Sequence, residues 1–205
     1  MFTGIVETVG TIRDIERRSA THRFWVEAPP LAPELADGDS VAVDGACLTV
    51  VSLREDRFAF DVIGTTLERT IAAGYAEETP VNLERAMRAN SRLDGHLVQG
   101  HVDGIGHLLR CMMEGEFWLM DFRLPAAVAS LTVEHGSVAI NGVSLTVSEM
   151  LEAEVCRIGV IPYTHAHTNL GRLEAGAPVN VEGDLVGKYV QKILSARQDA
   201  LKEAR

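Results

Sequence analysis

Cysteine is scarce in this chain of 205 residues, which contains three, Cys47, Cys111 and Cys156, and no C-x-x-C pair. An odd number of widely spaced cysteines argues against a disulfide framework and against a structural zinc site. Free thiols are typical of a reducing compartment. We therefore expect a fold without disulfides or metal, and we predict that the protein works in the cytoplasm.

Long apolar runs and excess positive charge are also missing. No stretch approaches the roughly 18 consecutive apolar residues that a membrane-spanning helix needs. The first residues, MFTGIVETVG, do not show the basic region and apolar run of a secretion signal. The 19 basic residues are outnumbered by 29 acidic ones, which gives a net charge of -10. Because such a surface repels phosphate backbones, we expect neither nucleic acid nor membrane as a partner.

The sequence does contain an internal repeat, and a repeat decides the architecture. The segment SVAVDGACLTV at 40–50 returns 97 residues later as SVAINGVSLTV at 137–147. Before it, TGIVE at 3–7 matches QGHVD at 99–103, and after it PVNLE at 80–84 matches PVNVE at 178–182. Three matches in the same order predict two homologous domains, residues 1–96 and 97–183, and a tail over 184–205.

Each half has the pattern of an all-β domain. Apolar and β-branched residues flank Asp44-Gly45 and Asn141-Gly142, and such dipeptides favour the two-residue hairpin turn because they adopt positive φ angles. The runs FWV at 24–26 and RFAFDV at 57–62 are rich in strand-forming residues. Short strands broken by Gly, Pro and Asp predict a small barrel. We expect a tandem pair of homologous six-stranded antiparallel β-barrels.

The tail has a different periodicity. Between Leu185 and Lys202 the apolar residues recur at helical spacing and form one stripe: Leu185, Val186, Tyr189, Val190, Ile193, Leu194 and Leu201. Asp184 precedes this stretch as a candidate N-cap. We expect a C-terminal helix, whose stripe either folds back onto the barrels of its own chain or packs against other copies.

Three segments resemble signatures of a known family. MFTGIVE at 1–7, GHLVQGHVDG at 95–104 and GKYV at 187–190 resemble the riboflavin synthase alpha-chain family, and the doubled segments fit it too. The resemblance covers essentially the whole chain. It implies two six-stranded barrels, which bind lumazine, and a helix that assembles a homotrimer.

The resemblance also implies a reaction. Two molecules of 6,7-dimethyl-8-ribityllumazine exchange a four-carbon unit, giving riboflavin and 5-amino-6-ribitylamino-pyrimidinedione, with no cofactor and no metal. One molecule lies in the N-terminal barrel of one subunit and the other in the C-terminal barrel of a neighbour. Which barrel holds the donor, and whether lumazine synthase is a further partner, stay open.

The resemblance implies catalytic roles for Cys47, His101, Ser144, Thr146, Ser40 and Asp184. Cys47 and Ser144 are equivalent in the repeat, and such groups can add reversibly to the electron-poor lumazine ring or hydrogen-bond to it. A thiol needs a helper to become a thiolate near neutral pH. The plainer alternative for Cys47 is a small buried strand residue.

The other candidates also have plainer alternatives. His101 can carry protons near neutral pH, which the loss of a proton from a lumazine methyl group requires, or it can make a structural hydrogen bond. We expect the nearby His96 to be structural. Thr49 and Thr146 follow Cys47 and Ser144 by two positions, so strand alternation places each pair on one face, although threonine also favours strands in general. Asp184 matches a family position near the reacting centre and is also a candidate helix cap.

The resemblance further implies two sets of substrate-binding residues. In the N-terminal barrel they are Gly4, Ile5, Val6, Cys47, Leu48, Thr49, Asp61, Val62, Ile63, Gly64, Thr65 and Thr66. In the C-terminal barrel they are Gly100, His101, Val102, His135, Ser144, Leu145, Thr146, Val160, Ile161, Pro162, Tyr163, Thr164 and His165. Thr65 and His135 depart from the family pattern, which has glutamate and lysine there. His165 and His167 form a His-x-His pair, but no thiol or carboxylate lies nearby in sequence, so we assign no metal.

Two rival functions fit the same fold class. A non-catalytic lumazine- or flavin-binding protein would show degenerate site residues in one half, whereas Cys47, Thr49, His101, Ser144 and Thr146 are all present. A flavin-using oxidoreductase would carry a glycine-rich nucleotide-binding turn after a strand, and the sequence has no such turn. The enzyme is therefore the favoured interpretation.

Overall fold

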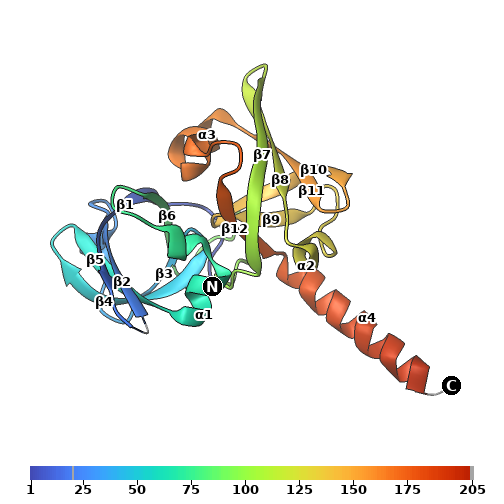
Figure 1. Cartoon of the computed structure of the whole chain (residues 1–205), viewed down its shortest axis with the longest axis horizontal. Helices are drawn as coiled ribbons and strands as arrows, with labels where there is room; N and C mark the ends of the chain where they lie inside the picture. The colour runs from blue at the N-terminus through green and yellow to red at the C-terminus, as the bar shows by residue number, and fades with distance from the viewer. Residues whose placement is uncertain (20, 204–205) are drawn as a thin grey trace.

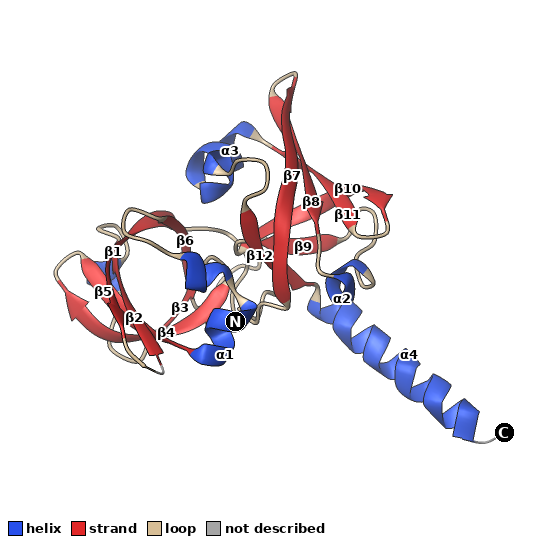
Figure 2. Cartoon of the chain, viewed as in Figure 1, coloured by secondary structure: helices blue, strands red, loops and turns tan. Residues whose placement is uncertain are grey.

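In the computed structural model, which describes residues 1–19 and 21–203, the chain forms two closed β-barrels and a long C-terminal helix (Figures 1 and 2). The first barrel contains β1 (Thr8–Arg17), β2 (Thr21–Glu27), β3 (Ser40–Val43), β4 (Ala46–Arg54), β5 (Arg57–Ile63) and β6 (Pro80–Arg85). The short helices η1 (Ala32–Glu34), α1 (Gly64–Arg69) and η2 (Ile71–Gly74) connect its strands.

The second barrel repeats this order. It contains β7 (Gly104–Glu114), β8 (Phe117–Arg123), β9 (Ser137–Ile140), β10 (Val143–Glu152), β11 (Val155–Val160) and β12 (Pro178–Gly183). Its connecting helices are α2 (Ala126–Ala129), α3 (Pro162–His167) and η3 (Asn169–Arg172). The strand orders are β1-β2-β5-β4-β3-β6 and, from the equivalent strand, β7-β8-β11-β10-β9-β12. The prediction of two homologous six-stranded antiparallel barrels is confirmed.

Each barrel has a core of its own. The first is filled by phenylalanine, leucine and valine side chains that include Phe24, Phe58 and Phe60, all buried. The second is built around Met120, Phe122 and aliphatic residues. A third and smaller cluster, Phe2, Ala42, Val98 and Ala139, joins the two barrels. Because the closed barrels leave few unpaired strand edges, contact between them depends on this small patch and on the turns described next.

The two predicted hairpin turns meet at the junction of the barrels. Asp44 and Gly45 have φ angles of 45° and 78°, and Asn141 and Gly142 have 45° and 74°. Both residues of each turn are therefore left-handed, as a type I′ hairpin requires. A Cβ atom added to Gly45 would lie 2.7 Å from the backbone nitrogen of Gly142, and the reverse addition gives the same distance. Only glycine therefore fits at positions 45 and 142, the second central residue of each turn.

A buried polar network surrounds these turns. The Asp44 carboxylate accepts hydrogen bonds from the Tyr75 hydroxyl, the Asn82 backbone and the Asn169 side chain, each at 2.8 Å. Asn180 donates its side-chain amide to the Asp44 carbonyl oxygen at 2.8 Å. Burial raises the pKa of Asp44 to about 7, and these hydrogen bonds only partly oppose that effect. The equivalent residue of the second barrel is Asn141, so only one of the two turns carries a side chain that can ionise.

Helix α4 (Leu185–Glu203) leaves the second barrel and projects away from both barrels (Figure 1). Asp184 Oδ1 accepts the backbone N–H of Val186 at 2.8 Å, which supports its predicted N-cap role. Val186, Tyr189, Val190, Ile193 and Leu194 are all exposed, between 50% and 66%. The side chain of Leu201 lies outside the described part. Within the described residues, no helix is long and apolar enough to cross a membrane.

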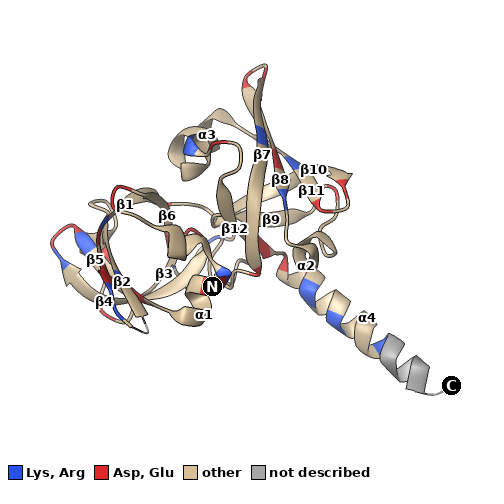
Figure 3. Ribbon diagram, in the orientation of Figure 1, with Lys and Arg blue, Asp and Glu red and all other residues tan. Residues whose placement is uncertain are grey.

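Charged residues of both signs are spread over the two barrels, and lysine and arginine residues recur along α4 (Figure 3).

Candidate functional site

Four of the candidate catalytic residues, Ser40, Cys47, Ser144 and Thr146, lie in the two repeated hairpins, whereas His101 precedes β7 and Asp184 follows β12. In β4, Cys47 pairs with Ala42 of β3, and Ala42 pairs with Glu84 of β6, so the three form one cross-strand row. The second barrel repeats this row as Ser144, Ala139 and Glu182. Thr49 and Thr146 are exposed on the same faces, opposite Ser40 and Ser137. Cys47 and Ser144 are half-buried.

The segments that lead into the barrels cross over. The Gly100 carbonyl accepts the Cys47 backbone N–H at 2.8 Å, and Val102 packs against the core of the first barrel. The Gly4 carbonyl accepts the Ser144 backbone N–H at 2.7 Å, and Val6 packs against the core of the second barrel.

This crossing corrects the sequence-based grouping of the site. We expected residues 4–6 in the N-terminal barrel and residues 100–102 in the C-terminal barrel, and the structure exchanges them. The physical reason is the short paired stretch between Phe2 and Val98 in which each backbone donates to the other, at 2.7 and 3.1 Å. It holds each leading segment against the barrel that it does not enter.

The pocket of the first barrel has a volume of about 270 Å³. It is lined by Ala46, Cys47, Thr65, Thr66, Arg69, Thr70, Gly100, His101 and Val102. The structure thus brings together Cys47, the residues that follow β5 and the crossed segment. Drug-sized ligands usually occupy about 300–1,000 Å³, so this pocket is small for a ribityl-bearing heterocycle and is open on one side.

In the second barrel, a histidine side chain contacts Ser144, the residue equivalent to Cys47. His96 Nδ1 lies 2.7 Å from Ser144 Oγ, and the imidazole is buried. Burial lowers the pKa of His96, so its neutral form is favoured. Its Nε2 atom is buried with no hydrogen-bond partner among the described residues. An added Cβ at Gly95 would lie 3.0 Å from Ser144 Oγ, so glycine allows this close approach.

We expected His96 to be structural, and the structure shows its imidazole in contact with Ser144, one of the candidate site residues. The sequence gives no signal for this contact, because His96 and Ser144 are 48 residues apart and meet only in the folded chain. Other residues without a predicted role are Arg69 and Thr70, which line the Cys47 pocket, and Phe2, which is fully buried between the barrels beside Gly100.

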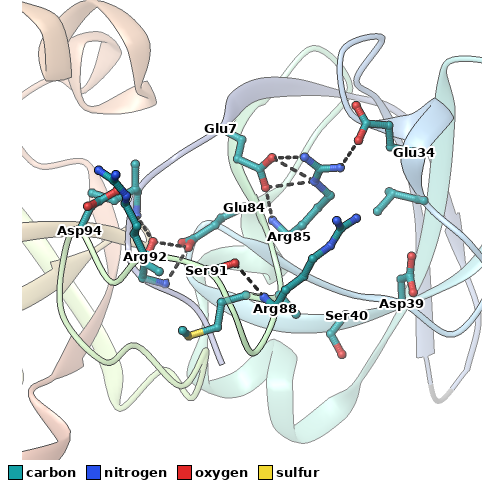
Figure 4. A pocket seen from close by; sticks show the side chains of 15 residues that line it. Glu7, Glu34, Asp39, Ser40, Glu84, Arg85, Arg88, Ser91, Arg92 and Asp94 are labelled. Carbon is teal, nitrogen blue, oxygen red and sulfur yellow. Dashed lines mark hydrogen bonds and ion pairs between the residues drawn. The ribbon is translucent and has the colours of Figure 1, made fainter.

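Ser40 lies in a different hollow from Cys47. This hollow, of about 650 Å³, is bordered by Thr3, Ser40, Glu84 and Arg85 (Figure 4). The Arg85 side chain bridges Glu7 and Glu34 at 2.6 Å each, so its charge is already compensated. Ser40 therefore does not join the Cys47 pocket within one chain. Asp184 and Ser137 line the corresponding hollow of the second barrel, beside α4.

Several expected substrate-binding residues do not present their side chains to a pocket. Leu48, Val62, Leu145 and Val160 are buried in the cores, so only their backbones can face a ligand. Asp61 is held by the guanidinium of Arg23 at 2.7 and 2.8 Å, which keeps the pKa of its carboxyl low. His135 is exposed in a turn with a φ of 63°.

The residues after β11 take part in two aromatic stacks, one half-buried and one exposed. His165 stacks on Trp118 with ring centroids 3.7 Å apart, and His167 stacks on Tyr163 at 4.0 Å. Ile161 and Tyr163 are exposed. Within residues 1–19 and 21–203, no group of three His, Cys, Asp or Glu side chains is placed to hold a metal ion.

The two barrels match a known domain family. The lumazine binding domain model matches residues 3–86 and again residues 99–184. A riboflavin synthase of Actinobacillus pleuropneumoniae is 39% identical over 95% of this chain and 90% of its own length. One of Mycobacterium bovis is 40% identical over 95% of this chain and 98% of its own length.

This chain belongs to the riboflavin synthase family. Solved structures agree with the assignment: LumP in complex with riboflavin aligns with a TM-score of 0.84 and 27% identity over 89% of this chain and 99% of its own. LumP in complex with 6,7-dimethyl-8-(1'-D-ribityl) lumazine aligns with a TM-score of 0.81 over 89% of this chain.

Proposed function

We propose that this member of the riboflavin synthase family converts two molecules of 6,7-dimethyl-8-ribityllumazine into riboflavin and 5-amino-6-ribitylamino-pyrimidinedione. One lumazine gives up two ring carbons with their methyl groups, and the other receives them. The atoms of two substrates equal those of the two products, so no water, oxidant or reductant enters. The lumazine ring itself accepts the electrons when a methyl group loses its proton, and the protein has to bind, orient and move protons.

The observation that carries this proposal is the repeated outer-face row. Cys47 and Ser144 occupy equivalent positions, each at one end of a row whose other end is a buried glutamate, and each followed by an exposed threonine two residues later. A reaction between two identical substrates needs two similar sites. A duplicated barrel with a polar row on each copy supplies them.

The proposed roles follow from chemistry and position. Cys47 and Ser144 add to or hydrogen-bond the ring of the bound lumazine, and Thr49 and Thr146 extend the same polar faces. His101, exposed beside the Cys47 pocket, exchanges the methyl proton. Ser40 and Asp184 border neighbouring hollows and act where the two substrates meet. The backbones after β5 and β11 bind the ring edge.

We further propose that the reacting pair lies between subunits of a homotrimer. The pocket beside Cys47, of about 270 Å³, is small for a ribityl-bearing heterocycle, which suits a site that a second chain completes. The five exposed apolar residues of α4 are each worth roughly 1.5–3 kcal/mol when fully buried, a large driving force for packing against other copies. An isolated projecting helix would leave them in water. The free thiols of Cys47, Cys111 and Cys156 suit the cytoplasm.

The experiment is incubation with ribityl-lumazine as the sole substrate. We expect the green fluorescence of riboflavin to appear at a rate proportional to protein and above that of a protein-free control. The rival function is a lumazine- or riboflavin-binding protein, which the likeness to the LumP complexes makes worth testing. Such a protein would bind the lumazine and leave the fluorescence at the control rate.

A further inference from the structure

Two buried glutamates occupy equivalent positions in the barrels. Glu84 is 6% exposed and Glu182 is 3% exposed, and each lies in the cross-strand row of its own barrel, next to Ala42 or Ala139. A buried carboxylate is costly unless strong hydrogen bonds stabilise its charge. Where those hydrogen bonds come from is therefore informative.

Both carboxylates bind backbone N–H groups of the crossed segments. Glu182 accepts from Gln99 at 2.7 Å, from Gly100 at 3.0 Å and from His101 at 2.9 Å. Three successive N–H groups directed at one carboxylate form an anion nest, which fixes the backbone as well as the charge. The ammonium of Lys188 forms its ion pair with Asp103, at 2.7 Å, so the hydrogen bonds to Glu182 come from the backbone.

Glu84 has the equivalent role for the N-terminal segment. It accepts from the Thr3 backbone at 2.6 Å, from the Thr3 hydroxyl at 2.7 Å and from the Gly4 backbone at 2.9 Å. Hydrogen bonds to an ionised acceptor are about twice as strong as neutral ones. Each segment is thus attached firmly to the barrel that supplies the glutamate.

The other side of each segment faces the opposite barrel. The Gly100 carbonyl accepts from Cys47, and the pocket of the first barrel is lined by Gly100, His101 and Val102. The Gly4 carbonyl accepts from Ser144 of the second barrel. A glutamate of the second barrel therefore holds a wall of the first pocket, and a glutamate of the first barrel holds the backbone beside Ser144.

We propose that Glu84 and Glu182 are positioning residues that act crosswise: Glu182 sets the substrate-binding geometry beside Cys47, and Glu84 sets the geometry beside Ser144. This inference rests on the proposed function in that both rows bind lumazine or flavin. Each site of a chain therefore depends on a glutamate of the other barrel, through the crossed segment that this glutamate holds.

Glutamine tests this role because it has the same shape without the charge. Its amide offers one acceptor oxygen, and its NH₂ group faces backbone N–H groups, so at least one of them loses its partner. Leaving such a group unsatisfied typically weakens a dependent equilibrium about tenfold or more. Glu182→Gln and Glu84→Gln form a matched pair, and each serves as the control for the other.

The measurement follows each site separately through a thiol. We expect bound riboflavin to protect Cys47 from iodoacetamide, and mass spectrometry of its peptide excludes signal from Cys111 and Cys156. A background with Cys47→Ser and Ser144→Cys places the reporter thiol in the second row. We expect Glu182→Gln to raise the riboflavin concentration for half-protection of Cys47 by about tenfold or more, with Glu84→Gln within about twofold of the parent chain. For the thiol at position 144 we expect the opposite result: Glu84→Gln raises the riboflavin concentration for half-protection, and Glu182→Gln leaves it within about twofold.

The proposal would be overturned if Glu84→Gln, and not Glu182→Gln, weakened the protection of Cys47. It would also be overturned if both variants affected both thiols equally. If a glutamine variant does not fold by circular dichroism, the corresponding aspartate variant replaces it. Aspartate keeps the charge but withdraws it by one methylene, and the same crossed pattern is expected. Turnover of lumazine by the parent chain is scored separately. Protection without turnover would remove the proposed enzyme and leave the crossed positioning intact.

Discussion

The imidazole of His96 and the hydroxyl of Ser144 are in hydrogen-bond contact, 2.7 Å apart, although 48 residues separate them in the chain. The equivalent residue of the first row is Cys47, a thiol in place of a hydroxyl. The two rows are therefore similar in backbone and different in proton chemistry. The neutral imidazole favoured by burial is suited to accept the proton of Ser144 when that hydroxyl adds to a ring.

Replacing His96 by asparagine tests this pairing. Asparagine can keep a hydrogen bond to Ser144 but cannot accept its proton, so we expect turnover to fall by about tenfold or more, with riboflavin affinity within about twofold. Because burial lowers the pKa of His96, the part of the rate that this substitution removes should persist as pH falls through about 6.5, the ordinary histidine value. Steady-state rates over a pH series check both points, and an unchanged rate in the variant would exclude the role.

Asp44 makes the stability of the protein depend on pH. Burial raises its folded-state pKa from 3.8 to about 7. A raised pKa means that the folded chain holds its proton more tightly, so this stabilisation is complete below the unfolded pKa and is lost as pH rises through about 7. The loss amounts to at most about 4 kcal/mol.

Asp44→Asn copies the residue that the repeat places at position 141. We expect the variant to be more stable than the parent chain at about pH 8 and to lose that advantage as pH falls to about 3.8, the unfolded pKa, as measured by urea unfolding. The matched control is Asn141→Asp, which adds a second buried carboxyl and should destabilise most at the higher pH. A pH-independent difference between the parent chain and Asp44→Asn would contradict the assignment.

Much of this architecture could be predicted from the sequence. The duplicated SVAxxGxxLTV segments, at 40–50 and 137–147, specify both the hairpins and the equivalence of Cys47 and Ser144. Asp44-Gly45 and Asn141-Gly142 predicted their turns because few other residues accept positive φ. The helical spacing after Asp184 likewise predicted α4.

The crossing of the leading segments could not be predicted in the same way. Matching two repeats assigns each residue to the barrel that it precedes, whereas Gly4 and Gly100 bind across the junction through backbone groups. Backbone hydrogen bonds carry no side-chain signature. Asn169 illustrates the same limit, because it faces Asp44 in the network while the equivalent residue in the first half is Ile71.

Cys47→Ser should lower turnover by about tenfold or more and leave the fold intact. The side chain is half-buried and lines the pocket beside Gly100, so serine fits without steric conflict. The weaker nucleophile then replaces the stronger one at a position where the second barrel already has serine. Rates are measured with ribityl-lumazine and the fold by circular dichroism. Rates equal to those of the parent chain would remove Cys47 from the catalytic set.

Deletion of residues 185–205 should separate binding from turnover. Both barrels are complete before Leu185, so each should still close and bind a single ligand. Without α4 we expect smaller species in sedimentation and little dismutation, because the reacting pair is proposed to lie between chains. A full-length protein that sediments as a fully active monomer would contradict the trimer and the site between chains.

The central claim is that one lumazine gives its four-carbon unit to another, and the mass balance of the reaction tests this most directly. Ribityl-lumazine is incubated with the protein, with no oxidant or reductant added, and substrate and products are quantified by chromatography. The proposed function predicts one riboflavin and one 5-amino-6-ribitylamino-pyrimidinedione for every two lumazines consumed. Recovery of the lumazine unchanged, or riboflavin formed without the pyrimidinedione, would contradict it.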